Sequence, residues 1–194
     1  MSTSALFVDT ILREMRGVLP IPDALVAGLI SHYELLLRWN PRMNLTTVTK
    51  PEEAAVRHYC ESLFLAAHIG EGSVADIGSG PGFPGIPVAL VDRSRRVDLV
   101  EAHQRKAVFL REAARDLPNV EVLSTRAEVV RGSYDWVVSR AVDPREVLRL
   151  RIGSRFALLL GSEDADVAGA DRTIPLPWGA RRVLVLGAFS RSSG

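Results

Sequence analysis

The sequence has one cysteine and no long apolar run, and each shortage excludes a class of protein. Cys60 alone cannot form an internal disulfide or a cysteine-clustered metal site. No run of apolar residues approaches the ~20 that a membrane span needs. Asp9 and Glu14 interrupt the first apolar segment, which has no basic start, so it predicts a helix and not a signal peptide. We therefore expect a cytoplasmic protein without a membrane or metal partner.

Positive charge is not in excess either, and arginine carries almost all of it. The formal net charge is +1, so the chain has no polybasic tail of the kind that binds nucleic acid. Lys50 and Lys106 are the only lysines. Arginine binds phosphate through a planar pair of donors, which suits an RNA ligand, but a GC-rich coding bias gives the same skew. The charge balance alone identifies no partner.

Residues 5–70 have the apolar spacing of helices. Apolar residues recur every three or four positions in two segments, which contain Leu6, Ile11, Met15, Val18 and Leu19, and Leu25, Leu29, Ile30, Tyr33, Leu36 and Leu37. The second helix should end near Asn40-Pro41, because a residue before proline avoids the helical region. A capping box at residues 49–52 should start a third helix. Its buried side would contain Val56, Tyr59, Leu63, Phe64 and Ala67. We expect residues 1–70 to form an N-terminal helical cap.

After residue 73 the pattern changes to short apolar strands that alternate with helices. Strands are predicted at 74–77, 97–100, 120–123, 136–138, 156–160 and 182–189, and helices at 84–91 and 104–116. This alternation predicts an α/β fold with right-handed parallel crossovers and helices on both faces. No segment before the last strand is long enough for a crossover helix, so that strand should be antiparallel. Residues 71–194 are expected to form this Rossmann-like, mostly parallel sheet.

A glycine-rich loop, with the sequence VADIGSGPGFPGIP, occupies residues 74–87. Glycines after a first strand allow a nucleotide to approach the backbone closely. Residues 80–85 also satisfy G-x-G-x-x-G, the pattern of dinucleotide-binding enzymes. However, Asp76 would repel a pyrophosphate and attract the sulfonium and ammonium of S-adenosyl-L-methionine, and Pro81 and Pro84 remove N–H donors that a pyrophosphate needs. We expect S-adenosyl-L-methionine to contact Asp76, Gly78, Gly80 and Gly82.

A second acid, Glu101, ends the second predicted strand about twenty residues after the loop. A carboxylate at this position accepts hydrogen bonds from both ribose hydroxyls of a bound nucleoside. Alternatively, Glu101 caps the helix that begins near Gln104. Asp98, within the same strand, is expected either to face solvent or to be covered by an arginine.

Six motifs occur in order along the chain, and together they resemble one family. They are NLT at 44–46, RHYCESL at 57–63, the glycine loop, RKAVFL at 105–110, RAE at 126–128 and VSRA at 138–141. From about residue 33 to residue 142 the chain resembles the RsmG/GidB family of bacterial 16S ribosomal RNA (guanine-N7) methyltransferases. The resemblance implies a class I methyltransferase fold and S-adenosyl-L-methionine as cofactor. It also implies small-subunit ribosomal RNA, or a ribosomal particle, as substrate.

The resemblance also assigns residues to the site. Carried over by motif, the residues that contact or border the cofactor are Gly78, Phe83, Glu101, Ala102, His103, Ala127, Glu128 and Arg140. Phe83 would pack against apolar parts of the cofactor, and Glu128 or the backbone at Ala127 would bind the adenine edge. The chain departs from the family at Leu160-Gly161, where members often carry Lys-Gly. It also has a short C-terminal segment, and Glu101 stands where aspartate is more usual.

Ser139 and Arg140, at the end of the fourth predicted strand, are the candidate catalytic residues. Ligands of doubly wound sheets lie beyond the carboxyl ends of the strands, so an acceptor base should arrive beside them. Guanine N7 has a free lone pair, and its methylation needs positioning without proton abstraction. Arg140 could hold guanine O6, a phosphate or the cofactor carboxylate. Alternatively, it only pairs with Asp143 or Glu146.

Other functions stay open on the sequence alone. The chain lacks the Asn-Pro-Pro-Tyr and Pro-Cys motifs of exocyclic-amine and pyrimidine methylation, which favours a ring nitrogen as acceptor. One alternative is a methyltransferase of the same fold that acts on a small molecule or another RNA. Another is a non-catalytic or dinucleotide-binding Rossmann protein. His58 should either contact an RNA phosphate or make a hydrogen bond between helices, and we expect the protein to be a monomer.

Overall fold

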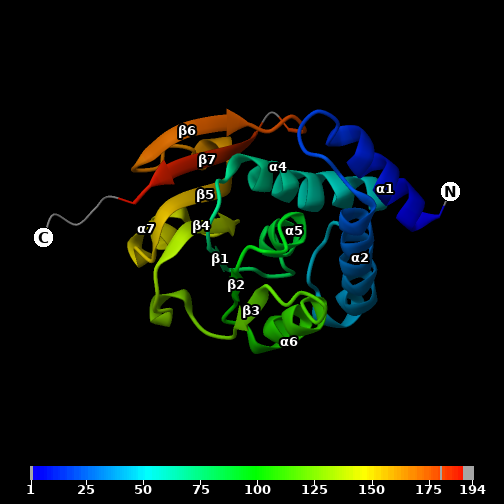
Figure 1. Ribbon diagram of the computed structural model, residues 1–194, viewed down its shortest axis with the longest axis horizontal. Coiled ribbons are helices and arrows are strands. Elements are labelled where there is room, and N and C mark those ends of the chain that lie inside the picture. The colour runs from blue at the N-terminus through cyan, green and yellow to red at the C-terminus, as the bar shows by residue number, and fades with distance from the viewer. Residues whose placement is uncertain (1, 180, 190–194) are drawn as a thin grey trace, which may run out of the picture.

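The computed structural model describes residues 2–179 and 181–189 and contains a seven-stranded sheet with helices on both faces (Figure 1). The strands are β1 (Val74–Ile77), β2 (Val97–Val100), β3 (Val120–Leu123), β4 (Tyr134–Arg140), β5 (Gly153–Gly161), β6 (Ala170–Pro175) and β7 (Arg182–Ala188). Their order across the sheet is β3-β2-β1-β4-β5-β7-β6. Strands β1 to β5 are parallel, and β7 is antiparallel to β5 and β6. The predicted fold class is therefore confirmed.

The helices are α1 (Thr3–Glu14), α2 (Asp23–Met43), α3 (Pro51–Ala54), the π-helix η1 (Ala55–Cys60), α4 (Glu61–His68), α5 (Gly85–Val91), α6 (Gln104–Ala113) and α7 (Pro144–Leu150), with short 3-10 turns η2 (Ala127–Val129) and η3 (Ser162–Asp164). None of the helices in the described residues is long and apolar enough to cross a membrane. The sequence did not predict α7 or β6. Five of the six β6 residues are exposed, so this edge strand lacks the apolar alternation that would reveal it.

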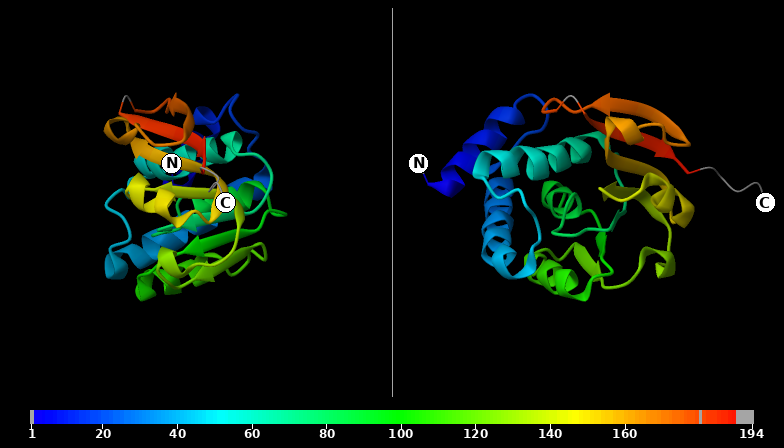
Figure 2. Two further views of the ribbon diagram at one scale, coloured as in Figure 1. Left: turned by 90° about the vertical axis from the view of Figure 1, so that its left-hand side faces the viewer. Right: turned by 180° about the vertical axis from the view of Figure 1, so that it is seen from behind.

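Alternate residues of the central strands face two separate hydrophobic clusters. Val74 and Val138 pack with Leu184 in the larger cluster, which also contains buried residues of α1, α2, α4, α5 and α6. Ala75 and Val137 face the smaller cluster, to which α7 contributes. Figures 1 and 2 accordingly show α1 and α2 at one end of the molecule and α7 at the other. The N-terminal helices thus bury one face of the sheet, while the domain boundary at residue 70 stays a prediction.

The second helix is longer than expected. α2 passes through Pro41 and ends at Met43. The side chain of Asn40 donates to the carbonyl of Thr46 and accepts its N–H, each at 2.9 Å. The N–H of Asn44 donates to the Asn40 carbonyl at 2.8 Å. These bonds close one more turn after the proline, and Asn44 then ends the helix at φ 49° in the left-handed region that asparagine tolerates.

The third helical segment also differs from its prediction. It starts at Pro51 with Lys50 as N-cap, and a lysine side chain has no acceptor for the first N–H groups, so the predicted capping box is wrong. The π-helical turn η1 then adds a residue to one turn, which rotates α4 about the helix axis. Tyr59 and Leu63 are buried as expected, but Ala67 is exposed.

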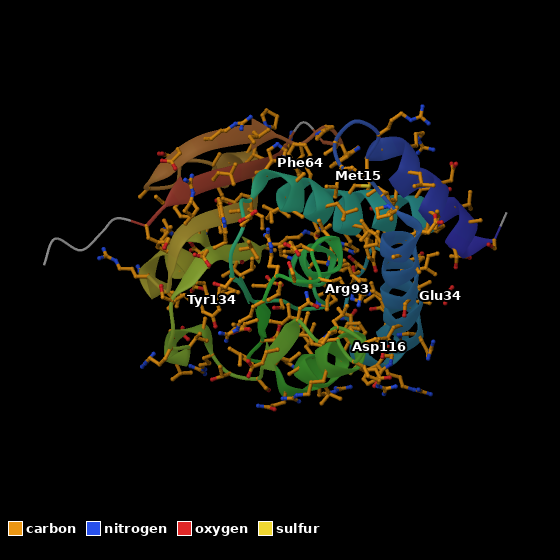
Figure 3. The ribbon with its side chains drawn as sticks, in the orientation of Figure 1. Met15, Glu34, Phe64, Arg93, Asp116 and Tyr134 are labelled. Atoms are coloured by element: carbon orange, nitrogen blue, oxygen red, sulfur yellow. The ribbon has the colours of Figure 1, made fainter. Side chains whose placement is uncertain are left out.

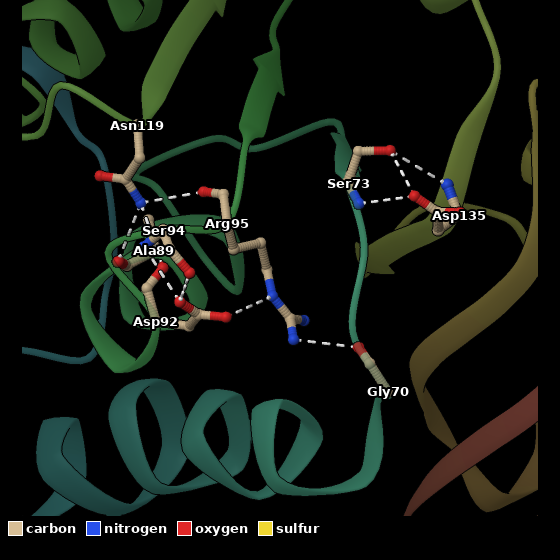
Figure 4. A network of polar contacts seen from close by, with 8 residues as sticks. All are labelled: Gly70, Ser73, Ala89, Asp92, Ser94, Arg95, Asn119 and Asp135. Atoms are coloured by element: carbon tan, nitrogen blue, oxygen red, sulfur yellow. Dashed lines mark hydrogen bonds and ion pairs between the residues drawn. The ribbon is translucent and has the colours of Figure 1, made fainter.

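Polar contacts between loops fix the amino ends of the strands (Figure 4). The side-chain amide of Asn119 donates to the carbonyls of Ala89, Asp92 and Arg95 at 3.0 to 3.3 Å. The carboxylate of Asp135 accepts the N–H and hydroxyl of Ser73 at 2.7 and 2.8 Å. These side chains are engaged within the fold at the edge opposite to the glycine loop.

The segment before β7 lies against the N-terminal helices. Trp178 donates its indole N–H to Glu14 at 2.9 Å, and its ring packs edge-on against Phe64 with centroids 5.9 Å apart. Met15 and Phe64 are both buried along this seam (Figure 3). The seam holds the start of β7 beside α4, which places Arg182 near the carboxyl end of the sheet.

Candidate active site

The glycine loop starts at the carboxyl end of β1, which lies between β2 and β4 in the sheet. The N–H groups of Gly78 and Ser79 both donate to the carbonyl of Val100, at 3.0 and 3.1 Å, and attach the loop to the end of β2. Gly78, Gly80 and Gly82 have φ values of 69°, 55° and 95°, which L side chains rarely adopt. The path of the backbone therefore requires these glycines.

Space around the loop differs from one glycine to the next. A Cβ at Gly78 would lie 2.6 Å from Cγ2 of Val142, and one at Gly85 would lie 2.6 Å from Oδ2 of Asp76. A Cβ at Gly80 would find its nearest neighbour 3.8 Å away. A Cβ at Gly80 would thus make an ordinary van der Waals contact, although Gly80 and Gly82 are buried and Gly78 is exposed.

Asp76 lies at the end of β1 with its side chain fully buried. Its Oδ2 accepts the N–H of Gly85 at 2.9 Å, whereas Oδ1 has no hydrogen-bond partner among the residues that the structure describes. Burial raises the pKa of Asp76 to about 7, against the lowering effect of the Gly85 N–H. A buried carboxyl group with one unpaired oxygen is suited to accept a further donor or a cation.

Glu101 connects the loop to the end of β2. Its Oε2 accepts the N–H of Gly80 at 2.9 Å, and its Oε1 accepts the N–H of His103 at 2.7 Å. Glu101 is buried, while Ala102 and His103 are exposed. His103, and not Glu101, is the N-cap of α6, so the capping alternative is wrong. Contact with ribose hydroxyls stays a prediction, for which each carboxylate oxygen retains a second lone pair.

Ala127 packs against the smaller hydrophobic cluster, which includes Ile77 and Val100 at the ends of β1 and β2, and Glu128 follows it. Ala127 and Glu128 belong to η2 and line a hollow of about 460 Å³ together with residues of α7 such as Arg149. Within the described chain, the walls of this hollow include neither the glycine loop nor Glu101. Their contact with an adenine edge therefore stays a prediction.

Arg140, at the end of β4, is held between two side chains of the N-terminal helices. Its Nη1 donates to Nδ1 of His58 at 2.8 Å, and its Nε lies 3.5 Å from Oε2 of Glu61. Arg182 of β7 donates to the same Glu61 oxygen at 2.8 Å. Burial lowers the pKa of Arg140 to about 10, which leaves the group cationic at neutral pH.

The alternative pairing of Arg140 with Asp143 or Glu146 is wrong. The carboxylate of Asp143 binds Arg145, with Nη2 and Oδ2 2.8 Å apart. Asp143 also caps α7 by accepting the backbone N–H of Arg145. Its charge is therefore satisfied locally.

His58 links Arg140 to the rest of the N-terminal region. Because arginine can only donate, Nδ1 of His58 accepts and the ring proton lies on Nε2, which is 2.9 Å from Oγ1 of Thr46. Burial, with the nearby Arg140 and Arg57, lowers the pKa of His58 to about 3. Of the two alternatives for His58, the structure shows the hydrogen bond within the protein.

Aromatic rings pack beneath the loop. Phe83 is buried, with its ring stacked on His58 at a centroid distance of 4.8 Å and edge-on to His32 and Tyr59. The implied contact of Phe83 with the cofactor stays a prediction and would use little exposed surface. The sequence did not predict a role for His32, because a histidine on the apolar face of a helix is only a weak signal of a functional site. His32 lies 2.9 Å from the Pro81 carbonyl and 2.9 Å from the Tyr59 hydroxyl.

Two polar side chains within strands, those of Ser139 and Asp98, make hydrogen bonds to other parts of the fold. Ser139 is buried and donates its hydroxyl to the carbonyl of Ile77 at 2.8 Å, which joins the ends of β4 and β1. Its role at the acceptor stays a prediction, and its hydroxyl donates within the sheet. Asp98 is covered by an arginine, as one alternative predicted. Arg96 donates to it at 3.0 and 2.6 Å, and Tyr134 donates at 2.6 Å.

A hollow of about 750 Å³ opens beside the end of β4. Its walls come from the β4–α7 connection, from the end of β5 with η3, and from the start of β7. Leu160 lines it at the position where the resembled family often has lysine. Arg182 of β7 and the preceding Arg181 also line it, and its other charged lining residues are Asp143, Arg145, Glu163, Asp164 and Asp166.

Comparison with known proteins identifies the family. The family model of GidB, rRNA small subunit methyltransferase G, matches residues 26–152. The chain belongs to this family. Ribosomal RNA small subunit methyltransferase G of Xanthomonas axonopodis pv. citri is 43% identical over 124 residues, 62% of this chain and 58% of the relative. The protein of that name from Xylella fastidiosa (strain M23) is 42% identical over 130 residues, 65% and 61% of the two chains. The match spans less than two thirds of these relatives.

Solved structures agree with the GidB assignment at the level of the fold. A SAM-dependent methyltransferase from Aquifex aeolicus superposes with a TM-score of 0.51 and 15% identity, over 61% of this chain and 82% of the other. The ribosomal protein L11 methylase of Lactobacillus delbrueckii subsp. bulgaricus gives 0.51 and 15%, over 73% and 86%. The GidB match includes the glycine loop, Glu101, η2 and Arg140 but ends before β5. Arg182 lies outside it.

Proposed function

We propose that this protein transfers a methyl group from S-adenosyl-L-methionine to N7 of a guanine in 16S ribosomal RNA. Membership of the GidB family supports this activity, as do the names of the two bacterial relatives. The observation that carries the proposal is the buried carboxyl group of Asp76, with its unpaired oxygen and a pKa raised to about 7. A cationic ligand beside it would stabilise the ionised form.

The residues of the loop fit this cofactor. The exposed Gly78 leaves the start of the loop accessible, Asp76 can accept from an ammonium group, and Glu101 can accept from ribose hydroxyls. When bound, S-adenosyl-L-methionine supplies an electrophilic methyl group on a positively charged sulfur. A dinucleotide fits less well, because its pyrophosphate would lie near two carboxylates.

Arg140 is the group that we assign to the acceptor. Guanine N7 attacks with its own lone pair, so no residue has to remove a proton and positioning supplies most of the catalysis. Arg140 remains protonated at neutral pH and can donate to guanine O6, which lies beside N7. His58 and Glu61 fix the direction of the guanidinium, and Ser139 fixes the end of the strand that carries it.

We infer the remaining properties from this activity. The substrate is small-subunit ribosomal RNA, free or in a particle, and the protein acts in the cytoplasm as a monomer. Residues 1–70 form a helical cap on the cofactor-binding domain at 71–194. Because the net charge is only +1, recognition should depend on the folded shape of the RNA, and small subunits should be better substrates than short oligonucleotides.

Methyl transfer to small subunits that lack the modification tests the proposal. We expect incorporation at a guanine whose 7-methyl group is revealed by reduction and aniline cleavage of the RNA chain. Asp76→Asn should abolish transfer, while Asp171→Asn, an exposed site on β6, should not. Calorimetry should show binding of S-adenosylhomocysteine and none of NAD. Transfer to a different base, or tight binding of NAD alone, would contradict the proposal.

A further inference from the structure

Glu61 is a buried carboxylate shared by two arginines from different strands. Its Oε2 lies 2.8 Å from Nη2 of Arg182 and 3.5 Å from Nε of Arg140. The Glu61 side chain is only 4% exposed, and those of Arg140 and Arg182 are 16% and 26% exposed. The remaining partner of Arg140, His58, is neutral. The three charged groups therefore carry a net charge of +1 in a largely buried place.

This excess charge is not compensated within the cluster. One carboxylate cannot neutralise two guanidinium groups, and a buried charge without a counter-charge is unfavourable. Nε of Arg182 is also buried and has no hydrogen-bond partner in the part of the chain that the structure describes. Since Arg182 makes the shorter contact with Glu61, Arg140 is not drawn completely into an ion pair. The cluster is thus suited to bind an anion.

The order of the strands indicates which anion this is. The glycine loop and Glu101 follow β1 and β2, on one side of β4, whereas Arg182 lies on the other side, where β5 and β7 line the large hollow. In the register of β5 and β7, Arg182 lies opposite Gly161 at the end of β5. Arg182 therefore lines the hollow on the side of β4 away from the glycine loop and Glu101.

We propose that Arg182, together with Arg140, binds a backbone phosphate of the substrate RNA next to the guanine that is methylated. The inference rests on the proposed function, since it takes RNA as the substrate. Arginine is suited to phosphate because its planar donors bind two oxygens at once. The hollow is also lined by the carboxylates of Asp143, Glu163, Asp164 and Asp166, of which Asp143 pairs with Arg145. These carboxylates repel a phosphate that does not contact the guanidinium groups. Glu61 keeps both guanidinium groups in place without cancelling their charge.

The charge balance provides a sharp test. Arg182→Gln makes the cluster neutral, whereas the double variant Glu61→Gln/Arg182→Gln restores its charge of +1. We expect Arg182→Gln to weaken binding of deproteinised 16S ribosomal RNA about tenfold or more in filter binding. The slope of log K against log salt should fall by about 0.7 to 0.9, the loss of one phosphate contact. The double variant should recover part of the affinity and most of the slope.

Other outcomes would overturn the proposal. If Arg182 only supports packing, the double variant binds RNA no better than Arg182→Gln and melts at a lower temperature. If the anion is the cofactor carboxylate, Arg182→Gln weakens the binding of S-adenosylhomocysteine measured by calorimetry. The slope of log K for RNA against log salt then stays unchanged. Arg172→Gln, the same change of charge on the exposed edge strand β6, should leave both properties near wild type.

Failure of this inference is distinguishable from failure of the proposed function. If wild type methylates small subunits while Arg182→Gln keeps the full salt slope, the phosphate site is wrong and the function stands. If wild type methylates no RNA, yet Arg182→Gln lowers the slope and the double variant restores it, the phosphate site stands and the function is wrong. Melting curves confirm in each case that the variants are folded.

Discussion

Arg140 donates a hydrogen bond from Nη1 to Nδ1 of His58 at 2.8 Å, so the cation at the end of β4 is held by a histidine that must remain neutral. A proton on Nδ1 would remove the acceptor and place two positive charges in contact. The ring proton is thereby fixed on Nε2, toward Thr46. This relationship couples the N-terminal helices to the strand that carries the candidate catalytic residue.

The first prediction concerns the titration of His58. In wild type its pKa of about 3 should keep the ring neutral throughout the pH range in which the protein is active. Arg140→Gln should raise this pKa, although burial, the larger cause, will hold it below the usual 6.5. NMR of histidine-labelled protein measures both values. A wild-type His58 that titrates near 6.5 would contradict the contact with Arg140.

The sequence was sufficient for the parts of the fold that local patterns specify. Strands β1, β2 and β3 lie at their predicted residues, because short apolar runs bounded by turn residues define buried strands. The glycines of the loop and the two acids at the ends of β1 and β2 were also found, since a fixed spacing along the chain places them at one edge of the sheet.

Long-range contacts could not be predicted in the same way. The sequence suggested partners for Arg140 within six residues, whereas its actual partner Glu61 is 79 positions earlier in the chain and is shared with Arg182. Both contacts depend on how α4 and the antiparallel strand β7 pack around the end of β4. No periodicity or motif in a single sequence encodes that packing. The buried position of His32 beneath the loop was missed for the same reason.

The second prediction is that Asp76 makes the fold less stable as the pH rises. Its pKa is about 7 in the folded protein, against 3.8 for an unperturbed aspartate side chain, so the folded state binds the proton more tightly. The stabilisation that protonation provides is complete below about pH 4 and is lost progressively up to about pH 7. The shift corresponds to a loss of up to about 4 kcal/mol.

Asp76→Asn removes this dependence. We expect its melting temperature to exceed that of wild type at pH 8 and to approach it at pH 4.5, as measured by circular dichroism. The same variant should fail to bind S-adenosylhomocysteine. Asp171→Asn, at an exposed position, provides the control for the loss of a carboxylate. An equal difference between Asp76→Asn and wild type at both pH values would show that the carboxyl group does not titrate in this range.

The third prediction separates two roles of Glu101. Glu101→Ala leaves the N–H groups of Gly80 and His103 without their acceptor and also removes the expected ribose contact. S-adenosylhomocysteine should therefore bind tens-fold more weakly or worse in calorimetry, a loss of about 2 to 4 kcal/mol. Glu101→Gln retains one acceptor oxygen and should lose less. Glu121→Gln, exposed on β3, should bind normally, and unchanged binding by Glu101→Ala would exclude Glu101 from the cofactor site.

The fourth prediction compares two glycines of the loop, one where an added Cβ meets no close atom and one where it would collide with buried side chains. A Cβ at Gly80 meets no atom closer than 3.8 Å, so Gly80→Ala incurs only the strain of its left-handed backbone, about 1 to 2 kcal/mol. The added methyl group takes up space beside the backbone that the proposed cofactor would contact. We therefore expect a small decrease in melting temperature and at least a tenfold loss of affinity for S-adenosylhomocysteine.

Gly85→Ala should have its main effect on the fold. Its Cβ would collide with Leu99 and lie 2.6 Å from Oδ2 of Asp76, and both neighbours are buried. Overpacking of this kind costs about 1 to 3 kcal/mol, which lowers the melting temperature by roughly 2 to 12 °C in a chain of this size. Calorimetry measures the affinity of each variant for S-adenosylhomocysteine, and thermal melts measure its stability. If Gly80→Ala binds S-adenosylhomocysteine as tightly as wild type, the cofactor does not contact the loop at Gly80, and the position that we propose for it is wrong.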